Sequence, residues 1–164
     1  MAMLDLVILP DERLHKISSP VASINGELAD YCDQMIEAMH EGSGIGLAGV
    51  QVGRMENLFV VHVPDEEPRV FINPEIRGFS ETLAPYEEGC LSIPGVYAEV
   101  QRPEAVQVRA WDRNGKEFDL EADGILARVI QHEYDHLQGK LFYEYLKPGQ
   151  RKRLLAAYEK NQKK

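Results

Sequence analysis

The segment His132-Glu133-Tyr134-Asp135-His136 constrains the fold of this chain more than any other, because it suits a helix that presents two imidazoles together. Residues four apart on a helix stack on one face, so both imidazoles can reach one metal ion. Glu133, beside the first histidine, can then take a proton from a water molecule on that ion. The pattern predicts a metal-dependent hydrolase, although the same spacing also arises by chance in structural helices.

The remaining sequence predicts an α+β fold. Apolar residues recur at helical spacing over 25–40 and 124–138, and Pro148 suits the first turn of a third helix. Runs of β-branched and aromatic residues predict strands over 58–63, 70–72, 105–111 and 116–121. Asn114-Gly115 predicts a type I′ turn between the last two. Strands grouped between helices indicate mostly antiparallel sheets around a central metal-binding helix, with N-terminal and C-terminal helices.

The length of the chain, and its lack of a signal peptide and of a membrane span, suggest one cytoplasmic domain. The 164 residues, 1–164, are expected to form a single catalytic domain. No apolar run approaches the ~20 residues of a membrane span, and the first residues lack the regions of a signal peptide. A reducing compartment argues against a disulfide between the two cysteines, and Cys32, on an apolar helical face, is expected in the core.

Charge is distributed unevenly along the chain. The net charge is −9, but residues 146–164 hold seven of the 18 Lys and Arg and only one of the 27 Asp and Glu, Glu159. This segment therefore carries +6 and the remaining body −15. An acidic body argues against nucleic acid binding and a direct DNA role. The segment 146–164 is expected to be a basic C-terminal helix that either docks on a polyanion or is a solvated surface.

Two histidines need at least one further ligand to hold a metal ion, and several residues are candidates. The extended zinc-protease pattern would place a third histidine at position 142, which is Phe142. The downstream carboxylates Glu144 and Glu159 are unpersuasive substitutes. Upstream, Cys90 offers a thiolate, a good ligand for a borderline-soft divalent ion. A lone cysteine is also frequently just a buried thiol, so the residues alone leave this choice open.

Three segments resemble the signature motifs of the bacterial-type peptide deformylases. Two are Glu88-Gly89-Cys90-Leu91-Ser92 and Gln131-His132-Glu133-Tyr134-Asp135-His136. The third, Gly44-Ile45-Gly46-Leu47-Ala48-Gly49-Val50-Gln51, is similar to G-φ-G-φ-A-A-x-Q. The three occur in the family's order and at its approximate spacing, and the resemblance covers nearly the whole chain.

The resemblance implies an enzyme that removes the formyl group from N-formylmethionine at the N-terminus of newly made polypeptides and releases formate. It implies a metal held by Cys90, His132 and His136. It makes Glu133 the general base and then the general acid, while the backbone N–H of Leu91 and the side chain of Gln51 face the oxyanion. It places the substrate along Ile45, Gly46, Glu88 and Gly89, and the methionine side chain in an apolar pocket that includes Ile125 and Val129.

The same resemblance bears on the metal and the partner. A Cys-His-His set can take Fe(II), Zn(II), Co(II) or Ni(II), and the resemblance implies Fe(II) as the physiological ion. A thiolate donates more charge than a third imidazole, so water on the ion is harder to ionise and the Glu133 carboxylate gains importance. For the basic tail, the resemblance implies the ribosome, where formylated chains emerge.

Three positions depart from the family pattern. Gly49 replaces the usual second alanine of the first motif and is expected to loosen a strand that carries Gln51. Tyr97 stands where an arginine is frequent. Arg128 occupies a pocket position that is often apolar, and it is expected either to lay its stem over the pocket with its charge in water or to point away.

Two other functions stay open at this stage. One is a metallopeptidase of the H-E-x-x-H type. The other is a metal-binding relative that has lost catalysis and only binds peptides. The presence of Glu133 and Gln51 argues against the second, because binding alone needs neither.

Overall fold

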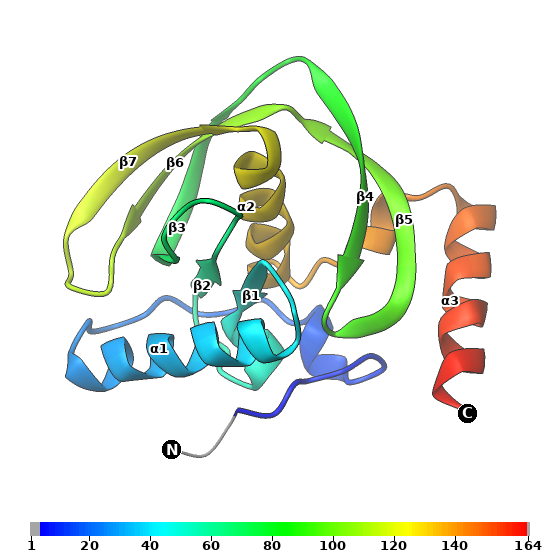
Figure 1. The fold of residues 1–164 in the computed structure, drawn as a ribbon, viewed down its shortest axis with the longest axis horizontal. Coiled ribbons are helices and arrows are strands. Elements are labelled where there is room, and N and C mark those ends of the chain that lie inside the picture. The colour runs from blue at the N-terminus through cyan, green and yellow to red at the C-terminus, as the bar shows by residue number, and fades with distance from the viewer. Residues whose placement is uncertain (1–3, 164) are drawn as a thin grey trace.

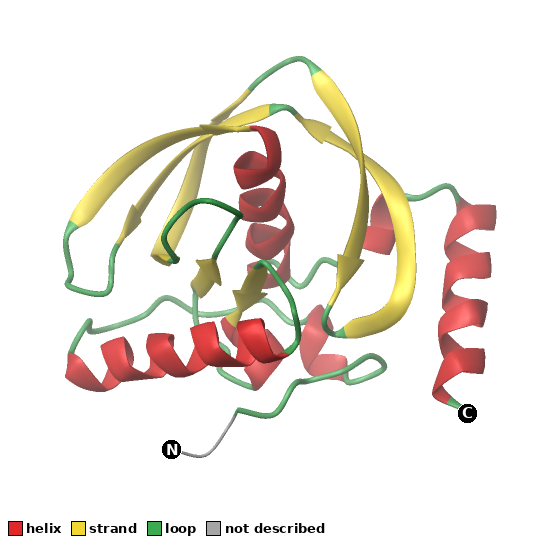
Figure 2. Cartoon of the chain, in the orientation of Figure 1, coloured by secondary structure: helices red, strands yellow, loops and turns green. Residues whose placement is uncertain are grey.

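The computed structural model describes residues 4–163 and combines helices with antiparallel strands (Figures 1 and 2). The helices are α1 (Gly26–Glu41), α2 (Gly124–Leu137) and α3 (Pro148–Gln162). The strands are β1 (Gly46–Ala48), β2 (Leu58–Val61), β3 (Arg69–Phe79), β4 (Leu83–Cys90), β5 (Ile93–Pro103), β6 (Ala105–Trp111) and β7 (Glu117–Asp123). Short 3-10 helices are η1 (Glu12–His15), η2 (Gly49–Val52) and η3 (Phe142–Tyr145).

Two antiparallel sheets enclose the central helix. The larger sheet has the strand order β1-β2-β3-β6-β7, and β4 and β5 form a separate two-stranded sheet. Figure 1 shows α2 between these sheets, α1 across the base of the larger one and α3 beyond β5. The predicted α+β class, with antiparallel sheets around a central helix and helices toward both ends of the chain, is confirmed.

Helix α2 is buried on almost every side. Its apolar residues Leu126, Ala127, Val129 and Ile130 join one core cluster with residues of η2 and the larger sheet. Its other side, which carries both histidines of the motif, is buried as well. The imidazoles are therefore held on a rigid element that is largely shielded from water.

Helix α1 packs on the strands next to that core. The side chain of Asn25 accepts a hydrogen bond from the backbone N–H of Leu28 at 3.0 Å, which caps the start of the helix. Leu28, Cys32 and Met35 are buried against residues of β1, β2 and β3. Cys32 is a free, fully buried core residue, as predicted.

The structure corrects several local predictions. The three glycines of residues 42–46 predict a loop rather than a helix or strand, but β1 begins at Gly46. The turn at Asn114-Gly115 is not type I′, since that turn needs positive φ at both residues and only Gly115 has it (φ 79°). The carboxylate of Asp112 instead accepts the backbone N–H groups of Asn114 and Lys116. Strands β1, β4 and β5 were not predicted at all.

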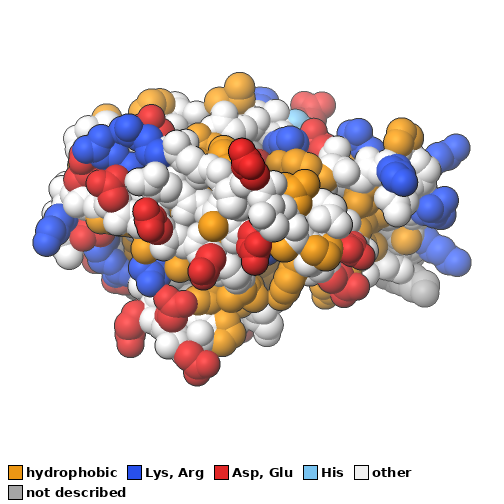
Figure 3. Space-filling model, turned by 90° about the horizontal axis from the view of Figure 1, so that it is seen from above, with side chains coloured by type: hydrophobic (Ala, Val, Ile, Leu, Met, Phe, Trp, Pro, Cys, Tyr) orange, Lys and Arg blue, Asp and Glu red, His pale blue; other side chains and the backbone are white. Residues whose placement is uncertain are grey.

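Helix α3 begins at Pro148, as predicted, and packs on β5 through one apolar edge. Leu154 and Tyr158 are buried there, and the Tyr158 hydroxyl donates to the carbonyl of Leu9. The basic residues of α3 are exposed, and Figure 3 shows blue side chains gathered at this end of the molecule. Within residues 4–163, every helix is too short or too polar to cross a membrane.

Candidate active site

Three potential metal ligands converge where β4 meets α2. Cys90 is the last residue of β4, and His132 and His136 lie one turn apart on α2. One ligand atom from each of the three lies within 4.8 Å of the other two. The Cys90 Sγ is 3.4 Å from Nε2 of His136. Among the ligands that the sequence left open, the structure therefore brings Cys90 to the histidine pair.

The rejected alternatives lie elsewhere. Phe142 stacks on the His132 ring, with the two centroids 6.1 Å apart, and is buried. The carboxylate of Glu144 accepts the backbone N–H of Leu141 at 2.7 Å, so it caps the turn η3. Glu159 is exposed on α3. None of these three residues is in the Cys90 cluster.

The cluster has the chemistry of a site for a borderline-soft divalent ion. A sulfur and two imidazole nitrogens are the donors that such ions favour. Within the described part of the chain, Nδ1 of His136 and Oε1 of Glu133 are buried without a hydrogen-bond partner. Buried polar atoms are rarely left unpaired, so the Glu133 oxygen points to a further group at this site, whereas Nδ1 of His136 is the ring nitrogen that does not approach Cys90. The residues present fit a metal ion with a water molecule beside it.

Glu133 is almost completely enclosed next to the cluster. Its exposed fraction is 4%, and burial raises the pKa of its carboxyl to about 7. The backbone of Gly46 packs directly against it, since a Cβ added at position 46 would lie 2.5 Å from Oε2 of Glu133. A carboxyl with a pKa close to neutral can both accept and return a proton.

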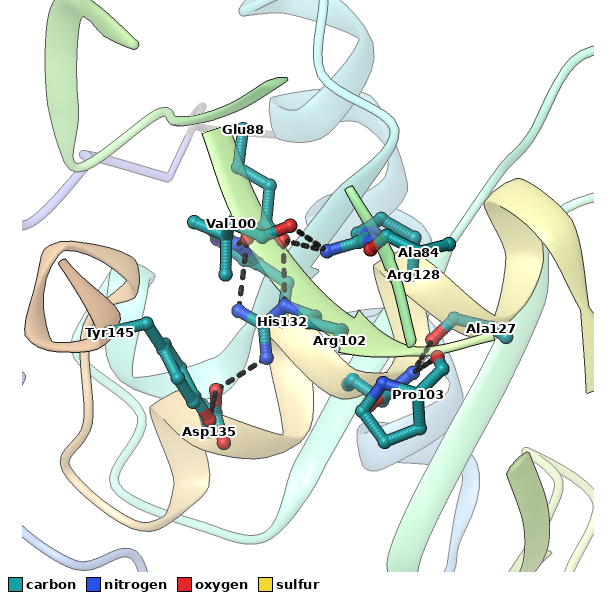
Figure 4. Close-up of polar contacts among 11 residues, drawn as sticks. Ala84, Glu88, Val100, Arg102, Pro103, Ala127, Arg128, His132, Asp135 and Tyr145 are labelled. Atoms are coloured by element: carbon teal, nitrogen blue, oxygen red, sulfur yellow. Dashed lines mark hydrogen bonds and ion pairs between the residues drawn. The ribbon is translucent and has the colours of Figure 1, made fainter. Parts of the chain in front are cut away.

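Glu88 anchors the network behind His132 (Figure 4). Its Oε1 lies 2.9 Å from Nδ1 of His132, and its two oxygens also accept from Arg102 and Arg128. Burial alone would raise the pKa of Glu88, but hydrogen bonds from His132 and Arg102 outweigh it and lower the pKa to about 2. The ionised carboxylate can only accept, so Nδ1 of His132 donates to it and Nε2 remains for a metal.

Arg102 extends this network to the far end of the site. One of its nitrogens pairs with Asp135 at 2.8 Å, and its guanidinium lies over the ring of Tyr145. Sequence reasoning missed Arg102, although it marked its partner Glu88. The available signal was weak: Arg102 follows the apolar positions Val96 and Val100 at even spacing, which places all three on the buried side of β5.

Gln51 points its amide at the cluster. Its Oε1 accepts the backbone N–H of Ala48 at 2.9 Å, which leaves Nε2 to donate to the Ser92 hydroxyl at 3.1 Å and to lie 3.5 Å from Cys90 Sγ. Gln51 lies in η2 rather than in a strand, so the predicted loosening of a strand by Gly49 is wrong. A Cβ at Gly49 would sit 2.6 Å from the carbonyl oxygen of Arg54, so the glycine permits closer backbone packing.

The backbone N–H of Leu91 is the second donor that the resemblance implied. Leu91 occupies the turn between β4 and β5, directly after Cys90. Its N–H has no hydrogen-bond acceptor among residues 4–163. Leu91 is thus next to Cys90 in sequence with a backbone N–H that is free to donate, and the Gln51 amide lies 3.5 Å from the Cys90 sulfur.

A pocket of about 540 Å³ opens beside the cluster. Its walls include Cys90, His132, Glu133 and Gln51, together with the predicted substrate-binding residues Ile45, Gly46, Glu88, Gly89 and Val129. Ile125 does not line it and packs behind, against the core cluster that contains Val129. Tyr97 covers Gly89, since a Cβ at that glycine would touch its ring.

The placement of the Arg128 side chain contradicts both predicted alternatives. Its side chain is 7% exposed, so its charge is not in water and it does not point away. Its Nη1 donates to Oε2 of Glu88 at 2.8 Å and to the carbonyl of Val100 at 2.9 Å, and its Nη2 donates to the carbonyl of Ala84. Sequence reasoning missed these partners because they belong to β4 and β5, which were not predicted.

Comparisons with known proteins agree with this geometry. The sequence model of the family described as Polypeptide deformylase matches residues 3–152. A protein named peptide deformylase from Azotobacter vinelandii is 46% identical over 162 residues, which cover 98% of this chain and 96% of that protein. A protein named peptide deformylase 1 from Shewanella oneidensis is 49% identical, with the same coverage of both chains.

Solved structures show the same similarity in three dimensions. The structure of peptide deformylase from Ehrlichia chaffeensis in complex with actinonin superposes with a TM-score of 0.95 at 36% identity and covers 100% of both chains. A peptide deformylase from Synechococcus elongatus, also in complex with actinonin, superposes with a TM-score of 0.90 at 42% identity. That match covers 94% of this chain and 86% of the other.

Proposed function

This chain belongs to the peptide deformylase family, and we propose that Cys90, His132 and His136 are its metal ligands and Glu133 its general base. The family is metal-dependent and removes the N-formyl group from nascent peptides, so the protein is a hydrolase of a formamide bond. The observation that carries the assignment of residues is the cluster of one sulfur and two imidazoles beside a buried, unpaired carboxylate.

Cys90, His132 and His136 would hold a divalent ion, whose positive charge would acidify a water molecule and polarise the formyl group. Glu133 takes a proton from the attacking water as its oxygen bonds to the formyl carbon, and then gives that proton to the departing amine as the carbon–nitrogen bond breaks. Burial raises the pKa of Glu133 above its ordinary value, which favours return of the proton to the amine. Formate and a free α-amino group are the products.

Two donors stabilise the negative charge that develops on the formyl oxygen. These are the Nε2 amide of Gln51 and the backbone N–H of Leu91, which lie next to Cys90 in space and in sequence. Loss of one such donor typically costs ~3 kcal/mol of transition-state stabilisation. Ser92 holds the Gln51 amide in place through its hydroxyl at 3.1 Å.

The substrate peptide lies along the pocket walls formed by Ile45, Gly46, Glu88 and Gly89. Its methionine side chain enters beside Val129, and Ile125 supports that wall from behind. Burial of the longer side chain makes formylmethionine a better substrate than formylalanine by roughly 2–3 kcal/mol.

Three broader assignments complete the proposal. Fe(II) is the physiological ion, and Zn(II), Co(II) and Ni(II) also fit the donor set. Residues 1–164 form one catalytic domain, which acts in the cytoplasm on chains as they are made. The basic segment 146–164 docks on the ribosome, and the exposed cations of α3 support this.

Formate release from formyl-Met-Ala-Ser, measured without oxygen and with metal analysis of the same sample, tests the proposal. We expect formate in proportion to bound metal, loss of activity on chelation, and no cleavage of internal peptide bonds. Internal cleavage without formate would replace this proposal with a metallopeptidase.

A further inference from the structure

Arg128 places a guanidinium in the wall of the pocket that takes the first side chain of the substrate. It precedes His132 by four residues on α2, so both side chains lie on the same face of the helix, one turn apart. Both residues line the pocket, and so does Val129. A side chain that enters beside Val129 and extends away from the cluster therefore runs toward Arg128.

The charge of Arg128 is balanced by its surroundings. Glu88 accepts from both Arg128 and Arg102, and Arg102 also pairs with Asp135. Two guanidinium groups thus meet two carboxylates in this buried network (Figure 4). The pocket wall is therefore polar without a surplus charge, and it can accept a neutral side chain.

Hydrogen-bonding capacity remains on Arg128 after these contacts. A guanidinium has five N–H donors. Three are used, on Glu88, on the carbonyl of Val100 and on the carbonyl of Ala84. For the other two, on Nε and Nη2, no acceptor occurs among residues 4–163. Arg128 borders the pocket, where a substrate oxygen can supply an acceptor for these two N–H groups.

Tyr86 adds to the polar character of the same wall. It lines the pocket, and the Arg128 guanidinium carbon lies 5.6 Å from the centre of its ring. Its ring and the Arg128 fork therefore form one corner of the pocket, built from β4 and α2. Val129 supplies the apolar side that accommodates the carbon chain.

We propose that this pocket also takes a first side chain that ends in a strong hydrogen-bond acceptor, and that the enzyme deformylates peptides that begin with oxidised formylmethionine, the sulfoxide. The sulfoxide oxygen is a strong acceptor near the end of the side chain, so it can accept a hydrogen bond from the free N–H groups of Arg128. The carbon atoms of the side chain keep their apolar contacts. The inference rests on the proposed function, because it uses the same pocket and the same reaction.

The test compares kcat/KM for three peptides that differ only in the first residue: formylmethionine, its sulfoxide, and formylnorleucine, which has no acceptor. The variants are Arg128→Met, which keeps much of the stem and removes the donors, and Arg128→Gln, which keeps a smaller donor. Arg109→Met, at a half-exposed arginine on β6 that pairs with Glu117 and does not line the pocket, is the matched control. The ratio of kcat/KM for the sulfoxide peptide to kcat/KM for the norleucine peptide is measured on the same sample of each protein. A partial loss of active enzyme therefore does not change this ratio.

We expect the wild-type enzyme and Arg109→Met to hydrolyse the sulfoxide peptide at least as well as the norleucine peptide. In Arg128→Met the ratio should fall by about tenfold or more, as for loss of a hydrogen bond from a charged donor. The ratio in Arg128→Gln should lie between those of the wild type and Arg128→Met. Poor sulfoxide turnover by the wild-type enzyme, or a smaller fall in Arg128→Met, overturns the inference. Formate release from the formylmethionine peptide reports separately on the proposed function.

Discussion

Nδ1 of His132 donates a hydrogen bond to Oε1 of Glu88 across 2.9 Å, and this contact fixes which nitrogen of the imidazole faces Cys90. Glu88 lies two residues before Cys90 on β4, so one strand supplies both a proposed metal ligand and the residue that orients another proposed ligand, His132. Such supporting contacts typically change metal affinity by 10–100-fold.

We therefore predict that Glu88→Gln weakens metal binding by about 10-fold or more, because a neutral amide holds His132 and its two arginine partners less firmly. Titration with a chromogenic chelator measures the change. Glu99→Gln, at an exposed carboxylate on β5, is the control and should bind metal as the wild type does. Equal affinity in all three proteins would remove the orienting role from Glu88.

The same carboxylate predicts how stability depends on pH. The pKa of Glu88 falls from its ordinary 4.5 to about 2 on folding. A depressed folded-state pKa contributes stability that is complete above about 4.5 and is lost as the pH falls through 2; here the contribution is about 3 kcal/mol. Urea unfolding should show that the free energy of unfolding decreases less between pH 5 and pH 2 in Glu88→Gln than in the wild type. Parallel curves would contradict this.

The sequence predicted which side chains come together at the candidate site better than it predicted the strands that hold them. Helical spacing predicted α2, and the motif residues on it lie together. Strand β4 escaped prediction because its sequence has no apolar alternation, with only Glu88 of its eight residues fully buried. The partners of Arg128 were missed for the same reason, since they are carbonyls and a carboxylate of strands 28 to 44 residues away.

The basic surface of α3 should govern binding to the ribosome. Leu154 and Tyr158 of α3 are buried, so deletion of the helix would expose the core. Reversal of the charge of exposed lysines tests the surface of α3 without removing these buried residues. We expect Lys152→Glu with Lys160→Glu to weaken cosedimentation with ribosomes at low salt and to leave turnover of short peptides unchanged. The control Lys116→Glu, in the β6–β7 turn, should bind normally. Salt-independent binding, or identical binding by all variants, argues for a merely solvated helix.

The thiolate-containing donor set predicts how the enzyme responds to its metal and to air. Apoprotein loaded with Fe(II) should be active but lose activity in oxygen, because Fe(II) and the Cys90 sulfur can both be oxidised. Co(II) and Ni(II) should preserve activity in air, and Zn(II) should bind tightly but turn over more slowly. Parallel reconstitution and assay measure this. A zinc form faster than an air-stable iron form would exclude Fe(II) as the physiological ion.

The most direct test of the account is the rate and metal content of Glu133→Ala, measured on one sample against the wild type. Glu133 is buried beside the ligand cluster but is not a member of it. The variant should therefore keep one metal ion per chain and the fold, while formate release from formyl-Met-Ala-Ser falls by about 100-fold or more. A metal-loaded variant that keeps above about a tenth of the wild-type rate would show that Glu133 is not the general base.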